Sequence, residues 1–451
     1  MKLKRIISVM LASLLILTML PMSASAAQKG ITLSKTSLTL SVGETENLTK
    51  TVTGYKKYTV QWSSSDKTVA TVSKGKVTAQ KEGTATITAI IKGTNYKATC
   101  KVTVASKSSV NMESKSYKNA NEFVSEIKVG WNLGNALDAT GGSGVSSETS
   151  WGNVKTTKEL ISAVKKAGFN TVRIPVSWGK HIDDSGNIEK EWLDRVQEVV
   201  DYAYDNSMYI ILNVHHDNDT FPLDEKTEAE TTKKYKNLWK QIAERFKDYD
   251  EKLIFEGRNE PATEGSPKQW AGGTKEEWGV LNRMYKVFAD TVRESGGNNN
   301  TRFLMIAPYV ATPASYQSMT AMEIPDDRVI VAVHSYAPHN LALDSNLSYT
   351  NFDENAKKEL NWIFDNINKA YISRGIPVIL DECGYTDKGH KDERIKAYKY
   401  MITKAKSYGI PCVIWDNGIT GEGGEKFGFI NRSTCEWYQP DVVKAIVDAA
   451  K

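Results

Sequence analysis

The sequence predicts an α/β protein in which a closed barrel of eight strand-and-helix units follows a small all-β sandwich. Three observations support this fold class. The chain has 451 residues, enough for a large core and an accessory module. Residues 31–104 contain short alternating β-branched runs separated by turns, as in a small antiparallel sandwich. After residue 120, eight apolar runs are interspersed with segments of helical pattern, as in a (β/α)8 barrel.

The first 26 residues have the pattern of a secretory signal peptide. Three basic residues precede a long apolar segment, and the small residues at 24–26 end it. We expect cleavage after residue 26 and a secreted, extracellular protein, with cell-surface association left open. A membrane anchor is the alternative interpretation. No later segment has the roughly 18 consecutive apolar residues that a membrane span requires, so no membrane association is expected after cleavage.

Net charge and cysteine content limit the classes of partner and of metal or redox site that the chain could have. The chain carries +4, and removal of the three basic residues of the signal leaves +1. This balance predicts neither a nucleic-acid partner nor an acidic polymer, and it favours a neutral one. The cysteines are too far apart for a zinc site, a redox motif or a disulfide framework: Cys100, Cys383, Cys412 and Cys435. We expect a monomer without a metal or cofactor.

Residues 28–105 form the predicted sandwich. The run "VQWSSSDKTVATVSKGKVTA" and the strands around it resemble the bacterial immunoglobulin-like domain of group 2. This domain is expected either to act as a spacer or to bind cell wall or polysaccharide. Residues 106–119 are polar and predict a linker, and residues 120–451 are assigned to the barrel.

In the barrel region, near-continuous apolar runs predict strands that are buried on both faces. Seven of the eight are followed directly by a segment with apolar residues at helical spacing. The runs are 127–135, 170–178, 209–217, 253–261, 301–309, 328–338, 377–385 and 411–418, and the helical segments are 156–168, 190–206, 230–248, 276–295, 354–375, 391–409 and 439–450. An open doubly wound sheet is the alternative, but no glycine-rich dinucleotide turn follows the first strand. Trp192, Trp239 and Trp362 lie in the helical segments and are expected in the core.

Polar and aromatic side chains stand where the apolar runs end, which is the carboxyl-terminal face that carries barrel active sites. Seven of the eight runs end in this way. The residues are Asn132, Arg173, His215, His216, Asn259, Glu260, His334, Tyr336, Glu382 and Trp415.

Two of these residues are carboxylates on opposite sides of the predicted barrel mouth. Glu260 ends the fourth strand and Glu382 ends the seventh. Glycoside hydrolysis requires such a pair, one protonated to assist the leaving oxygen and one ionised to attack or to activate water. A neutral glycan also fits the charge balance. Glu256, four residues before Glu260, is expected to bond inside the barrel.

The segments "GWNLGNALDA", "SWGN", "GFNTVRIPVSW", "NVHHD", "NEP", "VHSYAP", "DECG" and "IWDNG" together resemble glycoside hydrolase family 5, which contains cellulases with retaining chemistry. The closest forms are those of the subfamily rich in endo-β-1,4-glucanases and xyloglucanases. The resemblance covers the chain from about residue 121 to its end.

The resemblance implies that Glu260 is the acid/base and Glu382 the nucleophile. Arg173 and Tyr336 would keep Glu382 ionised, and His334 would help to set the protonation of Glu260. The other implied contacts are with the sugar beside the cleaved bond: Asn259 to its 2-hydroxyl, His215 and His216 to its other groups, and Trp415 as a stacking floor. Trp151 and Trp178 are further candidates for stacking, and Asn132 for support.

The sequence departs from the family pattern beside the nucleophile, where glycine and an aromatic residue are replaced by Asp381 and Cys383. Strand alternation is expected to turn Asp381 to the other face and leave an ordinary active enzyme. Cys383 should not bridge Cys412, because the two lie at opposite ends of neighbouring strands. Val154, which follows "SWGN" in place of proline, is a minor departure.

The leading hypothesis is therefore a secreted retaining endo-β-1,4-glucanase that cuts inside cellulose-type chains. The same chemistry on xyloglucan, xylan, mixed-linkage glucan or mannan remains open. A non-catalytic carbohydrate-binding surface protein is the alternative from another class.

Overall fold

The computed structural model describes residues 29–81, 83–105, 116–344 and 348–451. The chain forms two compact units, which divide at residue 108. The predicted signal peptide and residues 106–115 of the predicted linker lie outside the described residues. Among the helices of the described part, none is both long and apolar enough to cross a bilayer.

The N-terminal unit is a small β sandwich, as predicted. A four-stranded sheet has the order β2-β9-β8-β5, a three-stranded sheet has the order β3-β7-β6, and β1 pairs with β4. Alternate apolar side chains of the two larger sheets share one buried cluster, which includes Val77, Ile87 and Val102. The strands are β1 (Gly30–Leu33), β2 (Ser37–Ser41), β3 (Thr45–Asn47), β4 (Lys50–Thr53), β5 (Val60–Ser64), β6 (Ala70–Ser73), β7 (Lys76–Ala79), β8 (Gly83–Ile91) and β9 (Lys97–Ala105).

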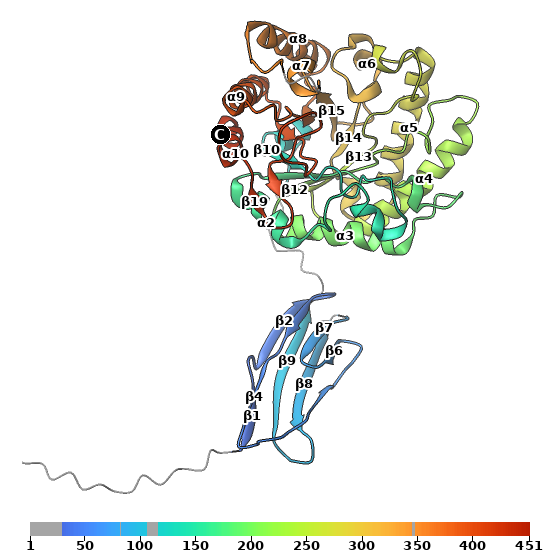
Figure 1. Cartoon of the computed structure of the whole chain (residues 1–451). Coiled ribbons are helices and arrows are strands. Elements are labelled where there is room, and N and C mark those ends of the chain that lie inside the picture. The colour runs from blue at the N-terminus through green and yellow to red at the C-terminus, as the bar shows by residue number, and fades with distance from the viewer. Residues whose placement is uncertain (1–28, 82, 106–115, 345–347) are drawn as a thin grey trace, which may run out of the picture. The chain divides into compact units, whose positions relative to one another are not determined.

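The C-terminal unit is a closed parallel barrel of eight strands in chain order, which confirms the predicted fold class. Its helices form a ring around the strands (Figure 1). The barrel strands are β10 (Val129–Asn132), β11 (Thr171–Ile174), β12 (Tyr209–Asn213), β13 (Leu253–Glu256), β14 (Leu304–Ile306), β15 (Val329–Ser335), β16 (Val378–Cys383) and β17 (Cys412–Ile414). The α-helices are α1 (Ala120–Val124), α2 (Lys158–Ala167), α3 (Lys190–Asp205), α4 (Glu228–Phe246), α5 (Lys275–Glu294), α6 (Tyr316–Ala321), α7 (His339–Ala342), α8 (Glu354–Ala370), α9 (Lys391–Ser407) and α10 (Pro440–Ala450).

Short elements complete the loops of this unit. They are the 3₁₀ turns η1 (Gly144–Thr149), η2 (Gly179–His181), η3 (Gln269–Ala271), η4 (Gly297–Asn300), η5 (Tyr309–Ala311) and η6 (Ile372–Arg374), and the hairpin strands β18 (Ile430–Asn431) and β19 (Glu436–Trp437).

Helix α5 illustrates how local sequence holds the loops in place. Thr274 and Glu277 form a capping box, in which each side chain accepts the backbone N–H of the other. The other carboxylate oxygen of Glu277 accepts a hydrogen bond of 2.9 Å from the Tyr309 hydroxyl group. The start of α5 is thereby tied to the loop that follows β14.

The barrel interior changes from apolar to polar along its axis. Phe123 of α1 stacks on Phe303 with ring centroids 4.0 Å apart and belongs to the apolar cluster that fills the lower interior. Ile254 and Ile379 point into the same cluster. The next inward-facing residue of β13 is Glu256, which is fully buried. Along β13 the inward-facing side chains therefore change from apolar to charged towards the carboxyl end.

Strand β16 contains an irregularity that matters for the site. Val333 of β15 pairs with Leu380 of β16, but the next residue, His334, pairs with Glu382. Asp381 is thus an extra residue in a β-bulge, and the register against β17 shifts at the same place. The bulge lets two consecutive residues, Asp381 and Glu382, both turn to the inside.

Two expectations about packing differ from the structure. Trp192 and Trp239 are fully buried as expected, but Trp362 is exposed on α8, so its assignment to the core was wrong. Helical spacing alone does not reveal which edge of an amphipathic face meets solvent. Tyr117, placed in the predicted linker, is buried in the lower cluster of the barrel.

Candidate active site

Glu260 and Glu382 come together at the carboxyl end of the barrel. With His334, they form a group whose facing side-chain atoms all lie within 4.8 Å of one another. The Glu260 side chain is 33% exposed and that of Glu382 is 9% exposed. Retaining hydrolases hold their carboxyl groups about 5–5.5 Å apart, whereas inverting enzymes need about 6.5–9.5 Å. The spacing fits the retaining arrangement.

Glu382 is held by a cation and a hydroxyl group. Arg173 donates from Nη1 to Oε2 at 3.0 Å, and Tyr336 donates from its hydroxyl to Oε1 at 2.7 Å. Both contacts fix the orientation of the carboxylate. Burial and the negative charge of Glu382 hold the pKa of Tyr336 well above its ordinary value, so its hydroxyl remains a donor.

Glu260 has a different partner. Its Oε1 lies 2.8 Å from Nδ1 of His334, and the same nitrogen lies 3.8 Å from Oε2 of Glu382. Burial lowers the pKa of His334, but Glu382 and Asp381 outweigh burial and hold that pKa well above its ordinary value. The two carboxylates therefore have unequal surroundings, one an arginine and a tyrosine, the other a histidine.

Arg173 is the centre of a buried network. It binds Glu256 through two hydrogen bonds of 2.7 Å and donates to Oδ1 of Asn259 at 2.7 Å and to Oδ1 of Asn132 at 3.0 Å. Burial and the nearby Asp381 raise the pKa of Glu256 to about 7 against the opposing effect of Arg173. Glu256 thus bonds inside the barrel, as expected. Asn132 is also fully buried and acts as a support.

Asp381 does not face away from this network, so the expectation from strand alternation is wrong. Its Oδ2 lies 3.2 Å from Nε of Arg173, and its Oδ1 lies 3.6 Å from Nε2 of His334. The β-bulge is the reason, because it adds one residue and turns Glu382 to the same side. Burial raises the pKa of Asp381, but Arg173 and His334 outweigh burial and lower it overall.

His215 is a neutral hydrogen-bonding group. Burial, His216 and Arg173 lower its pKa well below the ordinary value. Nδ2 of Asn213 lies 3.0 Å from its Nδ1. An amide nitrogen can only donate, so Nδ1 accepts and the ring proton resides on Nε2. Asn213 was not identified from the sequence, although it stands two residues before His215 and so faces the same side of the strand.

The aromatic candidates occupy three different depths. Trp151 is 38% exposed and lies beside the exposed ring of His216, with centroids 5.5 Å apart. Trp415 is 8% exposed and parallel to His215, so only a small part of its ring is accessible. Trp178 is fully buried and donates from Nε1 to the Asn213 carbonyl oxygen. The expectation that Trp178 stacks on a sugar is corrected, because the ring has no accessible face.

Cys383 and Cys412 are free and buried. Burial and the neighbouring Cys412 side chain raise the pKa of the Cys383 thiol well above its ordinary value. The two side chains are therefore neighbours even though the residues stand at opposite ends of their strands. Cys383 also donates to the Val413 carbonyl oxygen at 3.7 Å.

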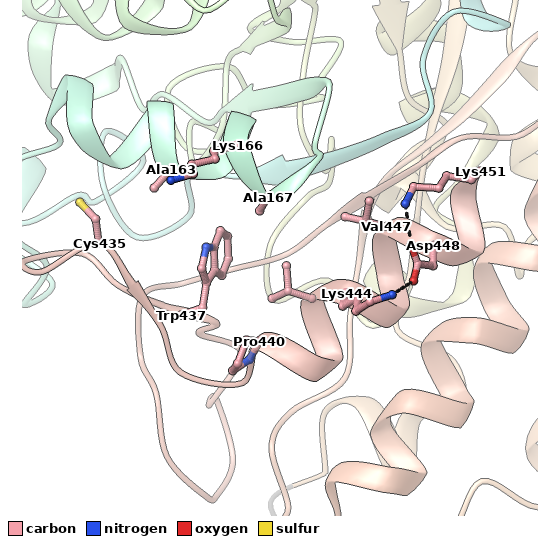
Figure 2. Close-up of a pocket in the computed structure, with 11 residues that line it drawn as sticks. Ala163, Lys166, Ala167, Cys435, Trp437, Pro440, Lys444, Val447, Asp448 and Lys451 are labelled. Carbon is pink, nitrogen blue, oxygen red and sulfur yellow. Dashed lines mark hydrogen bonds and ion pairs between the residues drawn. The ribbon is translucent and has the colours of Figure 1, made fainter. Parts of the chain in front are cut away.

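A pocket of about 530 Å³ lies outside the barrel, between α2 and α10 (Figure 2). Its lining includes Trp437 and Lys444 but none of the strand-end residues above. It is separate from the paired carboxylates and contributes nothing to their chemistry.

Similar proteins place the chain among known hydrolases. Residues 137–421 match the cellulase family, glycosyl hydrolase family 5, and residues 27–102 match the bacterial Ig-like domain of group 2. An endoglucanase A from Ruminococcus albus is 44% identical over 339 residues, which cover 74% of this chain and 93% of that protein.

Solved structures of endoglucanases are also similar to this chain. A broad specificity endoglucanase of subfamily GH5-4 from Ruminococcus champanellensis, with bound cellotriose, has a TM-score of 0.72 and 38% identity, covering 74% of this chain and 100% of that chain. A xyloglucan-specific endo-β-1,4-glucanase from a metagenomic library, in complex with cellotriose, has a TM-score of 0.70 and 43% identity, covering 73% and 98%.

Proposed function

The chain belongs to the cellulase family, glycosyl hydrolase family 5, and on that premise we propose that it is a secreted endo-β-1,4-glucanase that hydrolyses internal bonds of β-glucan chains with net retention. The observation that carries this proposal is the approach of the Glu260 and Glu382 oxygens to within 4.8 Å. The signal-like first 26 residues support secretion.

In the first step Glu382 attacks the anomeric carbon and Glu260 protonates the leaving oxygen. This assignment follows from the partners of each group. Glu382 accepts hydrogen bonds from Arg173 and Tyr336, which hold its carboxylate in one orientation for attack. Glu260 is the more exposed of the two and can reach a leaving group and then a water molecule.

In the second step Glu260 takes a proton from water, and the water displaces the sugar from Glu382. The two inversions give net retention. His215 offers its Nε2–H to a sugar hydroxyl group. Asn259, whose oxygen is occupied by Arg173, offers its NH2 group to the 2-hydroxyl of the bound sugar, a contact that strengthens as the transition state forms.

The substrate is a β-1,4-linked glucan, and the relatives indicate that several kinds of glucan are accepted. One solved relative has broad specificity and another is specific for xyloglucan, and both hold cellotriose. We include xyloglucan and mixed-linkage glucan in the expected range. Trp151 and His216, whose rings lie side by side, would contact the bound glucan chain.

The test is a side-by-side assay of reducing-end release from carboxymethylcellulose, xyloglucan, mixed-linkage glucan, xylan and mannan. Glu382→Gln and Glu260→Gln should each lower the rate on the preferred glucan by about 10³-fold or more. Glu294→Gln, on the exposed side of α5, is the matched control and should keep full activity. Equal activity of Glu382→Gln and the wild type would refute the proposal.

A further inference from the structure

Three buried polar atoms at the base of the site have no hydrogen-bond partner within the described part of the chain. They are Nε2 of His334 and both carboxylate oxygens of Asp381. Leaving such atoms unpaired costs free energy, so each needs a physical explanation. Two of these atoms face each other, because Nε2 and Oδ1 are 3.6 Å apart, whereas Oδ2 lies 3.2 Å from Nε of Arg173. A movement of about 0.7 Å would complete the hydrogen bond.

The position of the His334 ring limits where its protons can be. Asp381 is ionised beside Arg173, so it offers only acceptor oxygens to Nε2. A proton on Nε2 satisfies this contact, whereas a lone pair there would repel the carboxylate. The other ring nitrogen, Nδ1, lies 2.8 Å from Oε1 of Glu260. When Nε2 keeps its proton, the Nδ1–Glu260 pair is left with one exchangeable proton.

We propose that Asp381 is a positioning residue that fixes a proton on Nε2 of His334, so that Nδ1 of His334 and Glu260 share the single proton used in catalysis. The inference rests on the proposed function of Glu260 and adds a role to that site. Asp381 touches neither the sugar nor the reacting atoms. It acts through the histidine.

The proton balance is simple. Before cleavage the shared proton lies in the hydrogen bond between Nδ1 of His334 and Oε1 of Glu260. It passes through Oε1 to the leaving oxygen, which leaves Glu260 ionised and His334 neutral with its one ring proton on Nε2. When Glu260 later removes a proton from water, the pair returns to its starting state. No other donor or acceptor is needed.

Other charged groups also act on the His334 ring. Glu382 lies 3.8 Å from Nδ1, Glu256 interacts with the ring from β13, and Arg173 and His215 lie within electrostatic range of it. Glu382 and Glu260 face Nδ1, whereas Asp381 faces Nε2. Asp381 is therefore the group that selects the tautomer.

The first experiment compares Asp381→Asn with wild type in profiles of kcat/KM against pH. The amide oxygen still accepts Nε2–H, but the negative charge that favours the protonated pair is lost. The proton should leave the pair at lower pH, so the alkaline limb should move down by about 1 pH unit or more.

A matched control is Asp365→Asn, which also removes one carboxylate. Asp365 lies on α8 and accepts a hydrogen bond from the Tyr408 hydroxyl group. Its profile should be that of the wild type. If Asp381→Asn is folded and lowers kcat/KM equally at every pH without moving the alkaline limb, Asp381 is only structural and the proposal is overturned.

The second experiment needs no variant of Asp381 and no activity. The chain has six histidines, so ¹⁵N-histidine labelling gives a simple spectrum. The His334 signal is assigned by its loss in His334→Gln. Nε2 should carry a proton at every pH from about 5 to about 8. A neutral ring with its proton only on Nδ1 would overturn the proposal even if Asp381→Asn fails to fold, and failure of the glucanase proposal would appear separately, as a wild type without hydrolysis.

Discussion

At the residue scale, the site is organised by the guanidinium of Arg173, which touches three carboxylates and two amides. Glu256 and Asp381 lie below it, and Glu382 lies at the cleft. Burial of one arginine with several acidic groups is stabilising only when the hydrogen bonds are complete. Glu256 completes two of them, so it anchors the guanidinium that in turn orients Glu382.

The two tryptophans expected to stack on sugars provide a residue-scale prediction. Trp178 is fully buried and bonded to the Asn213 carbonyl, whereas Trp151 is 38% exposed. Trp178→Ala should lower the free energy of unfolding by about 3–5 kcal/mol through loss of packing. Trp151→Ala should change it by less than about 1 kcal/mol and should instead weaken oligosaccharide binding.

Denaturant titration and isothermal calorimetry with cellotetraose measure the two effects. The assignment fails if Trp151→Ala destabilises the fold as much as Trp178→Ala, or if Trp151→Ala binds the oligosaccharide as tightly as the wild type does.

At the element scale, the loops after β10 and β17 meet closely beside the catalytic centre. Gly134 donates its N–H to the Asp416 carbonyl at 3.0 Å, and a Cβ on Gly134 would stand 2.5 Å from the Trp415 ring. The ring is therefore held against backbone that has no room for a side chain. This contact explains how the loop after β10, which has no catalytic group, can still affect sugar binding.

Gly134→Ala should therefore displace Trp415 and raise KM for a cello-oligosaccharide about fivefold, equivalent to about 1 kcal/mol of lost stacking. Gly279→Ala is the control. It lies inside α5, and the nearest atom to its added methyl group is the flexible end of Arg283 at 3.2 Å. That control should keep KM and raise the free energy of unfolding by about 0.5–1 kcal/mol. An unchanged KM in Gly134→Ala would show that the position of Trp415 is unimportant.

The same scale shows what the sequence could predict. Apolar runs located the eight strands, and residues at the ends of those runs located Glu260, Glu382 and Arg173, because parallel strands in a barrel all end at one face. The side on which Asp381 lies could not be predicted by alternation, because the bulge comes from pairing with β15 and β17 together. The depth of Trp178 was missed because a strand-end ring can fold inwards to a backbone carbonyl.

At the scale of the whole molecule, the chain divides into a sandwich and a barrel that each have their own core. Composition and periodicity predicted both units. The chemistry described here lies in the barrel, where an apolar lower interior supports a polar layer and the polar layer supports the two carboxylates. The spacer and polysaccharide-binding interpretations of the sandwich both remain predictions.

The central claim is that Glu382 forms a covalent bond to the sugar while Glu260 handles the proton. Its most direct test is to incubate the full-length protein with a 2-deoxy-2-fluoro cellobioside that has a good leaving group. The fluorine slows both the formation and the hydrolysis of the bond to Glu382. The good leaving group speeds up formation alone, so the covalent intermediate accumulates. Mass spectrometry of the digested protein should find the fluorinated disaccharide on the peptide that contains Glu382. A label on Glu260 or Asp381 instead, or no label on a protein that cleaves glucan with inversion, would contradict the account.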